Sequence, residues 1–448
     1  MTFESMWTEV RLEDVASEIT VGYVGSMTQE YVSSGIPFLR SLNILPYQIS
    51  RQDLKYISPE FHKRIAKSTL RPGDLAVVRT GKPGTAAVIP QELGEVNCSD
   101  LVIIRPSEKL DVRYLAYYLN SQAGQNCVDS RLVGSVQKHF NIRDARSLKL
   151  KLPPLAEQKA IAHILGTLDD KIELNREMNK TLEAMARAIF KSWFVDFDPV
   201  RAKMEGRQPA GMDAATAELF PDEFEESALG MVPKGWKVIK LGDLIDIKHG
   251  YAFKGEFFRT EPPGDILLTP GNFAIGGGFK DDKFKYYLGE VPEEFVLDQG
   301  DLLVTMTDLS KAGDTLGYPA IIPAPRGSHY LHNQRLGKVI IKSGVSLSKL
   351  HLYYLLCTDA YRHEILASAT GTTVKHTSPD RIKAFDFLFP NNDISLIFGK
   401  FLTPSYNKII LNQEESLSLA SIRDTLLPKL LSGEIRVKEA EKIVETQL

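Results

Sequence analysis

Two long segments of the chain repeat apolar residues at intervals of three, four and seven positions. The first stripe runs from Ile161 to Ile189 and the second from Phe398 to Leu426. This spacing places one apolar stripe along a helix and is typical of helices that pack as a coiled coil. The pattern therefore predicts two long helices that bury their stripes against each other. The positions predicted to form this helix-pair interface are Leu168, Ile172, Asn175, Leu182, Ile409, Asn412 and Leu419.

Polar and helix-breaking residues interrupt both segments. Asn175 and Asn412 lie on the stripes, where we expect them to fix the register of the helices rather than to touch a ligand. Gly166-Thr167 and Thr403-Pro404 lie near the two starts. These pairs predict that each segment is a short helix followed by a longer one.

The two helical segments belong to an internal repeat that covers most of the chain. From Gly134 onward the copies align without a gap at an offset of 237 residues, so that Lys138-His139 matches Lys375-His376. Earlier matches follow the same order, from Trp7 and Trp236 to Gly84 and Gly317. Self-similarity of this kind indicates a duplicated structural unit.

The first part of each copy contains short apolar runs between turn signals, such as Leu75–Val78 and Leu101–Ile104. These runs predict strands mixed with a few helices. The predicted fold class is α+β, with two homologous mixed α/β domains separated by two long antiparallel helices and related by a pseudo-twofold axis. The predicted segments are a first domain (1–152), a central helical region (153–195), a linker (196–231), a second domain (232–391), a C-terminal helical region (392–435) and a tail (436–448). Because the linker is rich in Pro, Gly and acidic residues, we expect it to be extended, with at most a short helix.

The predicted helix pair has two interpretations. A helix from Pro154 to Phe194 would be roughly 60 Å long, and antiparallel packing would place one domain at each end, as on a ruler for a two-part target. The same pattern also suits a helical hairpin that only joins two enzymatic lobes.

Composition and charge exclude some classes of protein. Hydrophobic residues make up 43% of the chain and charged residues 25%, which is typical of a globular protein. No apolar run is long enough for a membrane span, the N-terminus does not resemble a secretion signal, and the three scattered cysteines suit neither disulfides nor zinc, so we expect a cytoplasmic protein. Residues 153–230 carry 9 Lys and Arg against 15 Asp and Glu, whereas residues 1–152 carry 19 against 16. Charge alone therefore does not indicate a nucleic-acid ligand.

Several motifs resemble the specificity subunits of type I restriction-modification enzymes, over nearly the whole chain. The Leu-Pro-Pro-Leu-Ala-Glu-Gln run at 152–158 and the Leu-Asp-Asp-Lys-Ile-Glu-Leu-Asn run at 168–175 resemble the central region of these subunits. Further matches lie at 190–200, 219–227 and 233–236. In the second copy Asn391-Asn392-Asp393 replaces the Pro-Leu-Ala-Glu-Gln stretch, which leaves open whether the two helix starts make equivalent contacts.

The resemblance implies a non-catalytic subunit with two target-recognition domains, each reading one half of an interrupted site in double-stranded DNA. The partners that it implies are two modification subunits, which methylate adenine, and restriction (motor-nuclease) subunits, which cut unmethylated DNA. It implies no cofactor in this chain, because S-adenosylmethionine, ATP and Mg²⁺ are expected on the partner subunits.

The sequence lacks the motifs of catalysis. An adenine methyltransferase needs Asn or Asp before Pro-Pro and an aromatic residue, but the two Pro-Pro pairs follow Leu152 and Glu261. No phosphate-binding Gly-x-x-x-x-Gly-Lys-Ser/Thr motif occurs, and Gly276-Gly277-Gly278 is interpreted as a turn. No catalytic or metal-binding residue is predicted. Two alternatives remain open, a duplicated single-chain methyltransferase or nuclease and a protein-interaction scaffold that binds no nucleic acid.

Polar residues that recur next to turns in both copies are the candidates for DNA contact, since Arg, Lys, Asn, Gln, Ser and Thr contact base edges and phosphates. The three sets in the first copy are Arg40, Ser41 and Asn43; Arg79, Thr80 and Lys82; and Gln137, Lys138 and His139. Their counterparts in the second copy are Thr269 and Asn272; Thr307 and Lys311; and Thr373, Lys375 and His376. We expect the shared Lys-His pair to contact the DNA backbone, and the differing Gln137 and Val374 to suit different bases.

Substitution of both Arg79 and Lys82 by alanine is predicted to weaken DNA binding by the chain assembled with its modification subunits, because two cations near the duplex are lost. Binding is measured with labelled duplexes at moderate salt. Unchanged affinity there would count against these contacts.

Overall fold

The computed structural model describes residues 7–131, 139–227, 230–281, 283–325 and 327–446. Contacts within the chain divide it into two compact units. Unit 1 consists of Met1–Glu177 and Asn412–Leu448, and unit 2 consists of Met178–Leu411. Each unit therefore contains one sheet-rich domain together with part of each long helix.

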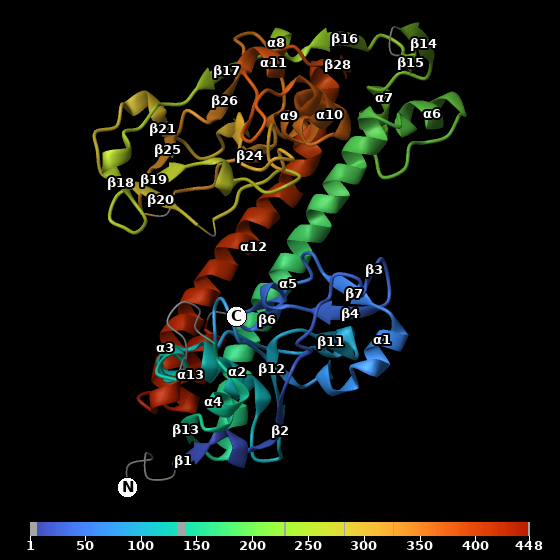
Figure 1. Ribbon diagram of the computed structural model, residues 1–448. Helices are drawn as coiled ribbons and strands as arrows, with labels where there is room; N and C mark the ends of the chain where they lie inside the picture. Colours follow the sequence, from blue (N-terminus) through green and yellow to red (C-terminus); the bar gives the residue numbers. More distant parts are fainter. Residues whose placement is uncertain (1–6, 132–138, 228–229, 282, 326, 447–448) are drawn as a thin grey trace. The chain divides into compact units, whose positions relative to one another are not determined.

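The long helices are continuous, contrary to the predicted breaks. Helix α5 spans Leu155–Phe194 and α12 spans Asn392–Ser432 (Figure 1). The hydroxyl groups of Thr167 and Thr403 each donate a hydrogen bond to the carbonyl oxygen four residues earlier, at 2.9 and 2.8 Å, so both threonines are accommodated inside the helix. Gly166 serves close packing instead, because a Cβ there would lie 2.9 Å from the guanidinium carbon of Arg113.

The two helices run antiparallel in both units, as predicted. In unit 1 Asp169 pairs with Arg423 at 2.6 Å, and Asn175, six residues later, donates to Glu415 at 2.8 Å. In unit 2 the rings of Phe190 and Phe398 lie 5.6 Å apart. Leu168, Ile172, Asn175, Asn412 and Leu419 of the predicted interface are buried, whereas Leu182 and Ile409 are half-buried.

The sheets of unit 1 lie between residues 8 and 152 in a domain that we call head 1. Its described residues form a four-stranded sheet in the order β10-β9-β12-β2 and a five-stranded sheet in the order β3-β7-β4-β11-β8, in which β4 and β11 are parallel. An antiparallel ribbon of β1 and β13 pairs Thr8 with Leu152 and so joins the start of the head to its end. The strands are β1 (Thr8–Arg11), β2 (Ala16–Val21), β3 (Tyr31–Val32), β4 (Ile36–Leu39), β5 (Ile44–Leu45), β6 (Gln48–Ile49), β7 (Lys55–Ile57), β8 (Thr69–Leu70), β9 (Leu75–Val78), β10 (Ala86–Val88), β11 (Val96–Cys98), β12 (Leu101–Pro106) and β13 (Lys149–Leu152).

Short helices connect these strands and cover the core. They are α1 (Pro59–Arg64), α2 (Val112–Asn120), α3 (Gln122–Asp129) and α4 (Ile142–Arg146), with a 3-10 turn η3 (Ser41–Asn43) after β4. The C-terminal α13 (Val437–Glu445) completes unit 1 by burying Ala440 and Val444 in the same core. The segment predicted as a tail is therefore largely helical.

The sheets of unit 2 repeat this topology in head 2 (residues 237–389). The orders β17-β26-β22-β24 and β18-β20-β19-β25-β21 match those of head 1 strand for strand, including the parallel pair β19 and β25. The ribbon β16-β28 corresponds to β1-β13. The strands are β16 (Lys237–Lys240), β17 (Ile245–His249), β18 (Phe258–Arg259), β19 (Asp265–Leu268), β20 (Lys285–Tyr287), β21 (Val296–Leu297), β22 (Leu302–Thr305), β23 (Thr307–Asp308), β24 (Pro319–Ile321), β25 (Tyr330–His332), β26 (Leu336–Ile341), β27 (Lys375–His376) and β28 (Asp386–Phe389). The predicted duplication and the α+β fold class are confirmed.

The helices of head 2 also correspond to those of head 1. They are α8 (Leu241–Leu244), α9 (Lys349–Leu356), α10 (Asp359–Ser368) and α11 (Pro379–Lys383), with a 3-10 turn η7 (Pro270–Asn272) after β19. Helices α9, α10 and α11 stand where α2, α3 and α4 stand in head 1.

The linker is folded, not extended. It contains α6 (Asp198–Met204), α7 (Ala214–Glu218) and a hairpin of β14 (Phe224–Ser227) and β15 (Gly230–Pro233). Val200 and Phe220 are buried in the core of unit 2, where Phe220 lies 5.3 Å from the ring of Trp193. These apolar side chains drive the segment onto the head, despite its many acidic and turn-forming residues.

In each unit an arginine and an acidic residue of the long helices hold the head. In unit 1 Asp169 of α5 accepts a 2.5 Å hydrogen bond from Tyr117 of α2 and pairs with Arg423 of α12, whose guanidinium lies 4.8 Å over the ring of Tyr47. Burial raises the pKa of the Tyr47 phenol to about 12. Because Tyr47 follows η3, this contact ties a surface loop of head 1 to the helices.

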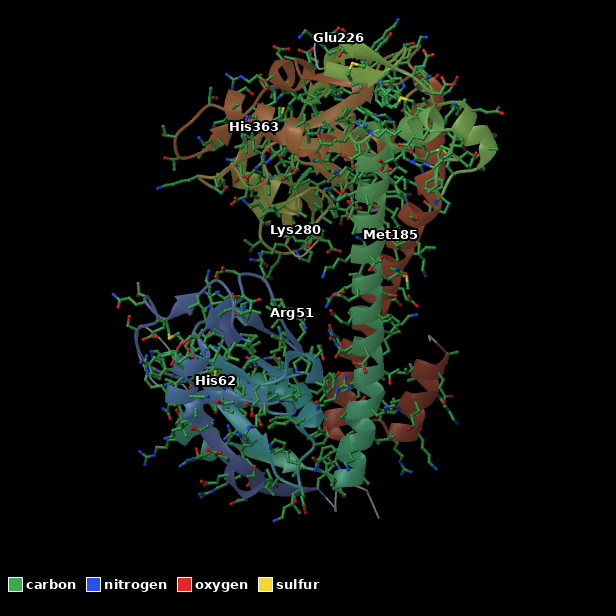
Figure 2. The ribbon with its side chains drawn as sticks, turned by 90° about the vertical axis from the view of Figure 1, so that its right-hand side faces the viewer. Arg51, His62, Met185, Glu226, Lys280 and His363 are labelled. Carbon is green, nitrogen blue, oxygen red and sulfur yellow. The ribbon has the colours of Figure 1, made fainter. Side chains whose placement is uncertain are left out.

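In unit 2 Glu183 of α5 accepts a 3.0 Å hydrogen bond from Tyr354 of α9 and pairs with Arg187 at 2.8 Å. Arg187 also donates to the carbonyl oxygen of Gly276, in the turn after η7. Tyr117 and Tyr354 are related by the 237-residue offset, so equivalent tyrosines of the two heads bond to an acid of α5, although the arginine comes from α12 in unit 1 and from α5 in unit 2. Met185, which is labelled in Figure 2, lies between Glu183 and Arg187 in the sequence of α5, and its side chain is exposed.

Leu168→Ala is predicted to destabilise unit 1 by about 2–5 kcal/mol, because a fully buried leucine leaves a cavity between α5 and the head. Leu174→Ala is the matched control, since this leucine of the same helix is 56% exposed and its loss should change the free energy of unfolding by less than about 0.5 kcal/mol. Both are measured by chemical denaturation. Equal effects of the two substitutions would contradict the packing described here.

Candidate nucleic-acid interface

The asparagines of the first predicted set are buried and hold loops. Asn43 accepts a hydrogen bond from the Arg40 amide at 3.0 Å and donates to the carbonyl oxygens of Ser50 and Gln52, both at 3.1 Å. None of its surface is exposed. The prediction that its amide reads a base is therefore wrong, because the side chain is enclosed and its hydrogen-bonding groups serve the loop that follows η3.

Asn272 has the same role in unit 2. Its oxygen accepts from the Thr269 amide at 2.9 Å, and its nitrogen donates to the carbonyl oxygens of Lys280 and Lys283 at 3.3 and 2.9 Å. It is 1% exposed, so its predicted base contact is wrong for the same reason. Thr269 is half-buried and also bonds to Asn272 through its hydroxyl. The recurrence of asparagine in both copies thus reflects loop structure.

Arg40 is held by an acidic neighbour, while Ser41 is half-buried at the start of η3. Arg40 pairs with Asp53 at 2.8 Å, and Lys55 pairs with the other oxygen of the same carboxylate at 2.7 Å. Hydrogen bonds from these two cations lower the pKa of Asp53 to about 2. The guanidinium of Arg40 is therefore partly neutralised before any ligand arrives.

The second and third predicted sets of head 1 meet. Thr80, which follows β9, and His139, which precedes α4, form a 3.0 Å hydrogen bond between Oγ1 and Nδ1. Beside it, the Phe140 amide donates to the carbonyl oxygen of Arg79 at 3.0 Å. Two loops that are 59 residues apart in the chain are thus joined through a side chain and through the backbone.

The same junction occurs in head 2. Thr307 and His376 form a 3.2 Å hydrogen bond between Oγ1 and Nδ1, and the Thr377 amide donates to the Met306 carbonyl oxygen at 3.0 Å. Here the two segments also form a short antiparallel pair, β23 with β27. We call these equivalent contacts the Thr–His junctions, Thr80–His139 in head 1 and Thr307–His376 in head 2.

Asp100, which the sequence analysis missed, organises the junction of head 1. It lies in the turn between β11 and β12, where it pairs with Arg79 at 2.5 Å and accepts a 3.3 Å hydrogen bond from the Thr80 hydroxyl. Since that hydroxyl donates to Asp100, it accepts from the Nδ1–H of His139. The neighbouring Ser99 amide donates to the Leu39 carbonyl oxygen, which connects this group to the loop of the first set.

Asp100 was missed because candidates were chosen by recurrence. The corresponding turn of head 2 carries Gln334-Arg335 and contacts its junction through the backbone, from the Met306 amide to the Arg335 carbonyl oxygen. An acid that is present in one copy alone leaves no such signal. A search for charged residues in turns between two buried strands would have included it.

The recurring Gly-Tyr pairs have a structural explanation. A Cβ on Gly22 would lie 2.7 Å from Cys98 Sγ, and one on Gly250 would lie 2.1 Å from the Asn333 carbonyl oxygen. Each glycine thus lets β2 or β17 approach the turn that leads into β12 or β26. The glycines shape the candidate surface without contributing a functional group to it.

The remaining candidates differ in exposure. Lys82, Lys311, Thr373 and His376 are exposed, and Lys375 is half-buried. The side chain of Arg79 is 18% exposed and remains engaged by Asp100. Gln137 and Lys138 lie outside the described residues. The exposed polar groups gather at the Thr–His junctions, so the junctions are the best candidates for contact with a ligand.

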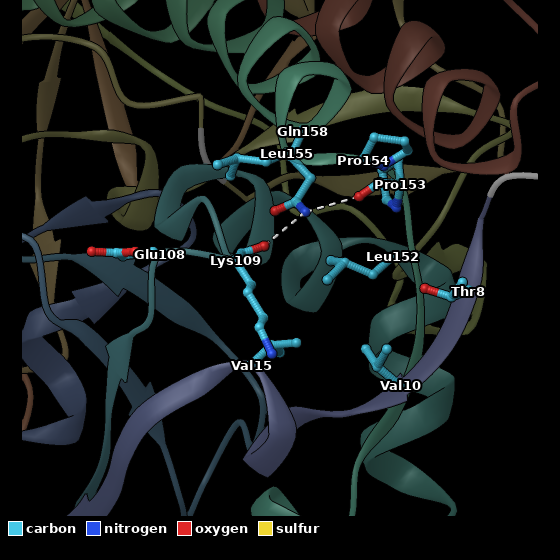
Figure 3. Close-up of a pocket in the computed structure, with 10 residues that line it drawn as sticks. All are labelled: Thr8, Val10, Val15, Glu108, Lys109, Leu152, Pro153, Pro154, Leu155 and Gln158. Carbon is cyan, nitrogen blue, oxygen red and sulfur yellow. Dashed lines mark hydrogen bonds between the residues drawn. The ribbon is translucent and has the colours of Figure 1, made fainter.

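The starts of the two long helices are held by equivalent hydrogen bonds, although their sequences differ. Gln158 of α5 accepts from the Asp111 amide at 2.9 Å and donates to the carbonyl oxygens of Lys109 and Pro153, in a shallow pocket shown in Figure 3. In α12 the equivalent Ser395 accepts from the Ser348 amide at 3.3 Å. Asp111 and Ser348 cap α2 and α9, so both copies fix the long helix to the same part of the head.

The described part of the chain also bears on the predictions about metal ligands, the glycine run and membrane spans. No group of three or more His, Cys, Asp and Glu side chains there could hold a metal ion. The Gly276-Gly277-Gly278 run is a turn with positive φ throughout, in which a Cβ on Gly277 would lie 2.7 Å from Cys357 Sγ. Among these residues no helix is long and apolar enough to cross a membrane.

Comparison with known proteins agrees with the duplicated geometry. A family model described as the type I restriction modification DNA specificity domain matches residues 4–184 and again 233–420. The type I restriction enzyme MjaIX specificity subunit of Methanocaldococcus jannaschii is 24% identical over 447 residues, which cover 97% of this chain and 94% of that protein. The HindI specificity subunit of Haemophilus influenzae is 29% identical over 340 residues, which cover 64% of this chain and 69% of that protein.

A similar fold occurs in a solved structure. The crystal structure of the type I restriction-modification system S subunit from M. genitalium has a TM-score of 0.55 and 14% sequence identity, and the match covers 95% of this chain and 96% of that one.

Asn43→Ala is predicted to lower the free energy of unfolding by roughly 1–3 kcal/mol, because backbone groups of a buried loop lose their partner. Chemical denaturation and hydrogen exchange of residues 40–53 measure the effect. Ser41→Ala, two residues away and half-buried, is the control and should be nearly neutral. A variant of Asn43 with normal stability and altered DNA discrimination would restore the base-reading role.

Proposed function

The chain belongs to the family of type I restriction-modification DNA specificity proteins, and from this membership we propose that it is the subunit that selects a two-part DNA site, with one half read by each head. The observation that supports this proposal most directly is the repetition of the Thr–His junction. Two copies of one fold present the same pair of loops, while the side chains around the loops differ. Equal scaffolds with different polar groups suit two half-sites of different sequence.

The family match favours this function over the two alternatives. A protein-interaction scaffold does not account for a match to a DNA specificity model in both halves of the chain. A duplicated single-chain methyltransferase would need its own catalytic motif, and the sequence contains none. We therefore propose that catalysis resides in partner subunits, with S-adenosylmethionine, ATP and Mg²⁺ bound there.

The repeat also supports the proposed partners. Two modification subunits of one kind would find equivalent contact sites on two equivalent units. Leu174 of α5 and Leu411 of α12, related by the 237-residue offset, are 56% and 57% exposed and suit such contacts. Restriction subunits complete the proposed assembly. Because its DNA target is inside the cell, we propose a cytoplasmic location.

A further part of the proposal concerns the spacer between the half-sites. Helices α5 and α12 are continuous over 40 and 41 residues and contribute to both units. Continuous helices are stiff, so this pair would set the distance between the two stretches of duplex that the heads contact. In this proposal the number of base pairs between the half-sites depends on the length of the two helices.

Methylated adenines mapped across the genome of a host that carries the complete enzyme should define one interrupted motif. Thr80→Val, which removes the hydroxyl of the head 1 junction at constant size, should reduce discrimination in one half of the motif by about fivefold, the value of one hydrogen bond. Thr307→Val should act in the same way on the other half. The readout is the fraction of near-cognate sites that become methylated.

Thr425→Val, an exposed threonine on α12, serves as the control and should leave both halves unchanged. The assignment of one half-site to each head would be refuted by either of two results. Both junction variants could reduce discrimination in the same half of the motif, or the native enzyme could methylate sites that share no interrupted motif.

A further inference from the structure

The two heads differ in length directly beside the Thr–His junction. Thr80 and Gly84 are four positions apart in the chain, whereas the equivalent Thr307 and Gly317 are ten positions apart. Both glycines have positive φ, and both lie against the following helices, next to Val128 of α3 and Ile365 of α10. Because both ends of this segment are anchored alike, head 2 contains an insertion of six residues at this point.

The inserted loop of head 2, residues 309–314, is held by one carboxylate. Asp308 accepts hydrogen bonds from the Ser310 amide at 2.6 Å, from the Thr315 hydroxyl at 2.7 Å and from the Thr315 amide. Burial raises the pKa of Asp308, but the hydrogen bonds from Ser310 and Thr315 outweigh it and lower the pKa overall. The carboxylate is therefore ionised near neutral pH, and bonds to an ionised acceptor are stronger than neutral ones.

A second set of contacts fixes the far side of the loop. Arg362 of α10 donates hydrogen bonds to the carbonyl oxygens of Gly313 and Leu316, and its guanidinium lies 4.5 Å over the ring of Tyr318. The Ser310 hydroxyl accepts from the Asp314 amide at 2.8 Å across the loop. The loop is thus closed on both sides, and the direction of its tip is set by the head.

The first half of this loop carries one apolar and one cationic side chain, both exposed. Leu309 is 65% exposed, although it directly follows the two buried residues of β23. Lys311 is exposed two positions later. A single exposed leucine needs no explanation by itself. This one lies two residues after Thr307 of the Thr307–His376 junction, at the start of the loop that Asp308 holds.

We propose that Leu309 is a specificity-determining residue of head 2, which contacts the methyl group of a thymine in the major groove while Lys311 contacts a neighbouring phosphate. Apolar side chains recognise thymine through this methyl group, which no other DNA base carries at that position. The inference rests on the proposed function, because it assigns one base contact to a head that reads DNA. It also explains why the loop is present in one head, since the two half-sites need not share that thymine.

The test uses the full chain assembled with its modification subunits and duplexes of the mapped motif. Each thymine in the half-site of head 2 is replaced in turn by deoxyuridine, which removes the methyl group and leaves base pairing intact. At one position the replacement should weaken binding by the native chain about fourfold, the effect of one buried methyl group. Leu309→Ala should weaken binding to the thymine duplex by a similar factor and should be insensitive to deoxyuridine at that position.

The matched control is Ile340→Ala, which removes an exposed apolar side chain (42%) from the end of β26 remote from Arg335 and should keep the native response to deoxyuridine. Lys311→Ala should weaken binding to all duplexes equally. It should also reduce the slope of log affinity against log salt concentration by about one.

The proposal is overturned if no thymine position loses its deoxyuridine effect in Leu309→Ala while the native assembly still prefers its motif. An assembly that binds all duplexes equally would instead refute the proposed function. The two failures are therefore distinguishable in one set of measurements.

Discussion

The apolar stripes of α5 and α12 are the constraint on which the rest of the structure depends. A helix with a continuous apolar face must bury it, and each stripe is buried partly by the other helix and partly by a head. In unit 1, Leu168 of α5 and Leu419 of α12 share one core with Tyr114 of the head. In unit 2, Phe190 and Phe398 share a core with Tyr354. Neither head can complete its core from its own copy of the repeat.

The ionic contacts at the helices carry this constraint to the surface loops. Each arginine lies on the long helix that the opposite copy of the repeat contributes to the unit. Arg423 contacts Tyr47 in the loop after η3, and Arg187 bonds to Gly276 in the loop after η7. A half-buried carboxylate, Asp169 or Glu183, pairs with the arginine and accepts a hydrogen bond from a tyrosine hydroxyl of the head. The result is a fixed platform on which the loops around the Thr–His junctions can differ in length and chemistry without disturbing the core.

The candidate surface was predictable only in part. Recurrence of Thr and His in both copies led to the junctions, because a contact needed by both heads leaves the same residues in both sequences. Asn43 and Asn272 also recur because both heads need them, but the need is structural. Their side chains bond to backbone groups of a loop, so their recurrence did not indicate a ligand contact. Asp100 and Leu309 were missed because each belongs to one head alone, although Lys311 of the same loop as Leu309 was among the candidates.

The sequence by itself determined the duplication, the fold class and the two long helices, because repeats and helical periodicity are local patterns that can be read along the chain. It also determined that the adenine-methyltransferase loop and the Gly-x-x-x-x-Gly-Lys-Ser/Thr motif are absent. Only the tertiary structure decided which of the candidate polar side chains are exposed and which are buried in loop contacts. Whether an amide is free or bound to a carbonyl group seven residues away, as in Asn43, depends on how the loop closes. The continuity of α12 through Pro404 and the folding of the linker were likewise decided by packing, which outweighs the local preference of the residues involved.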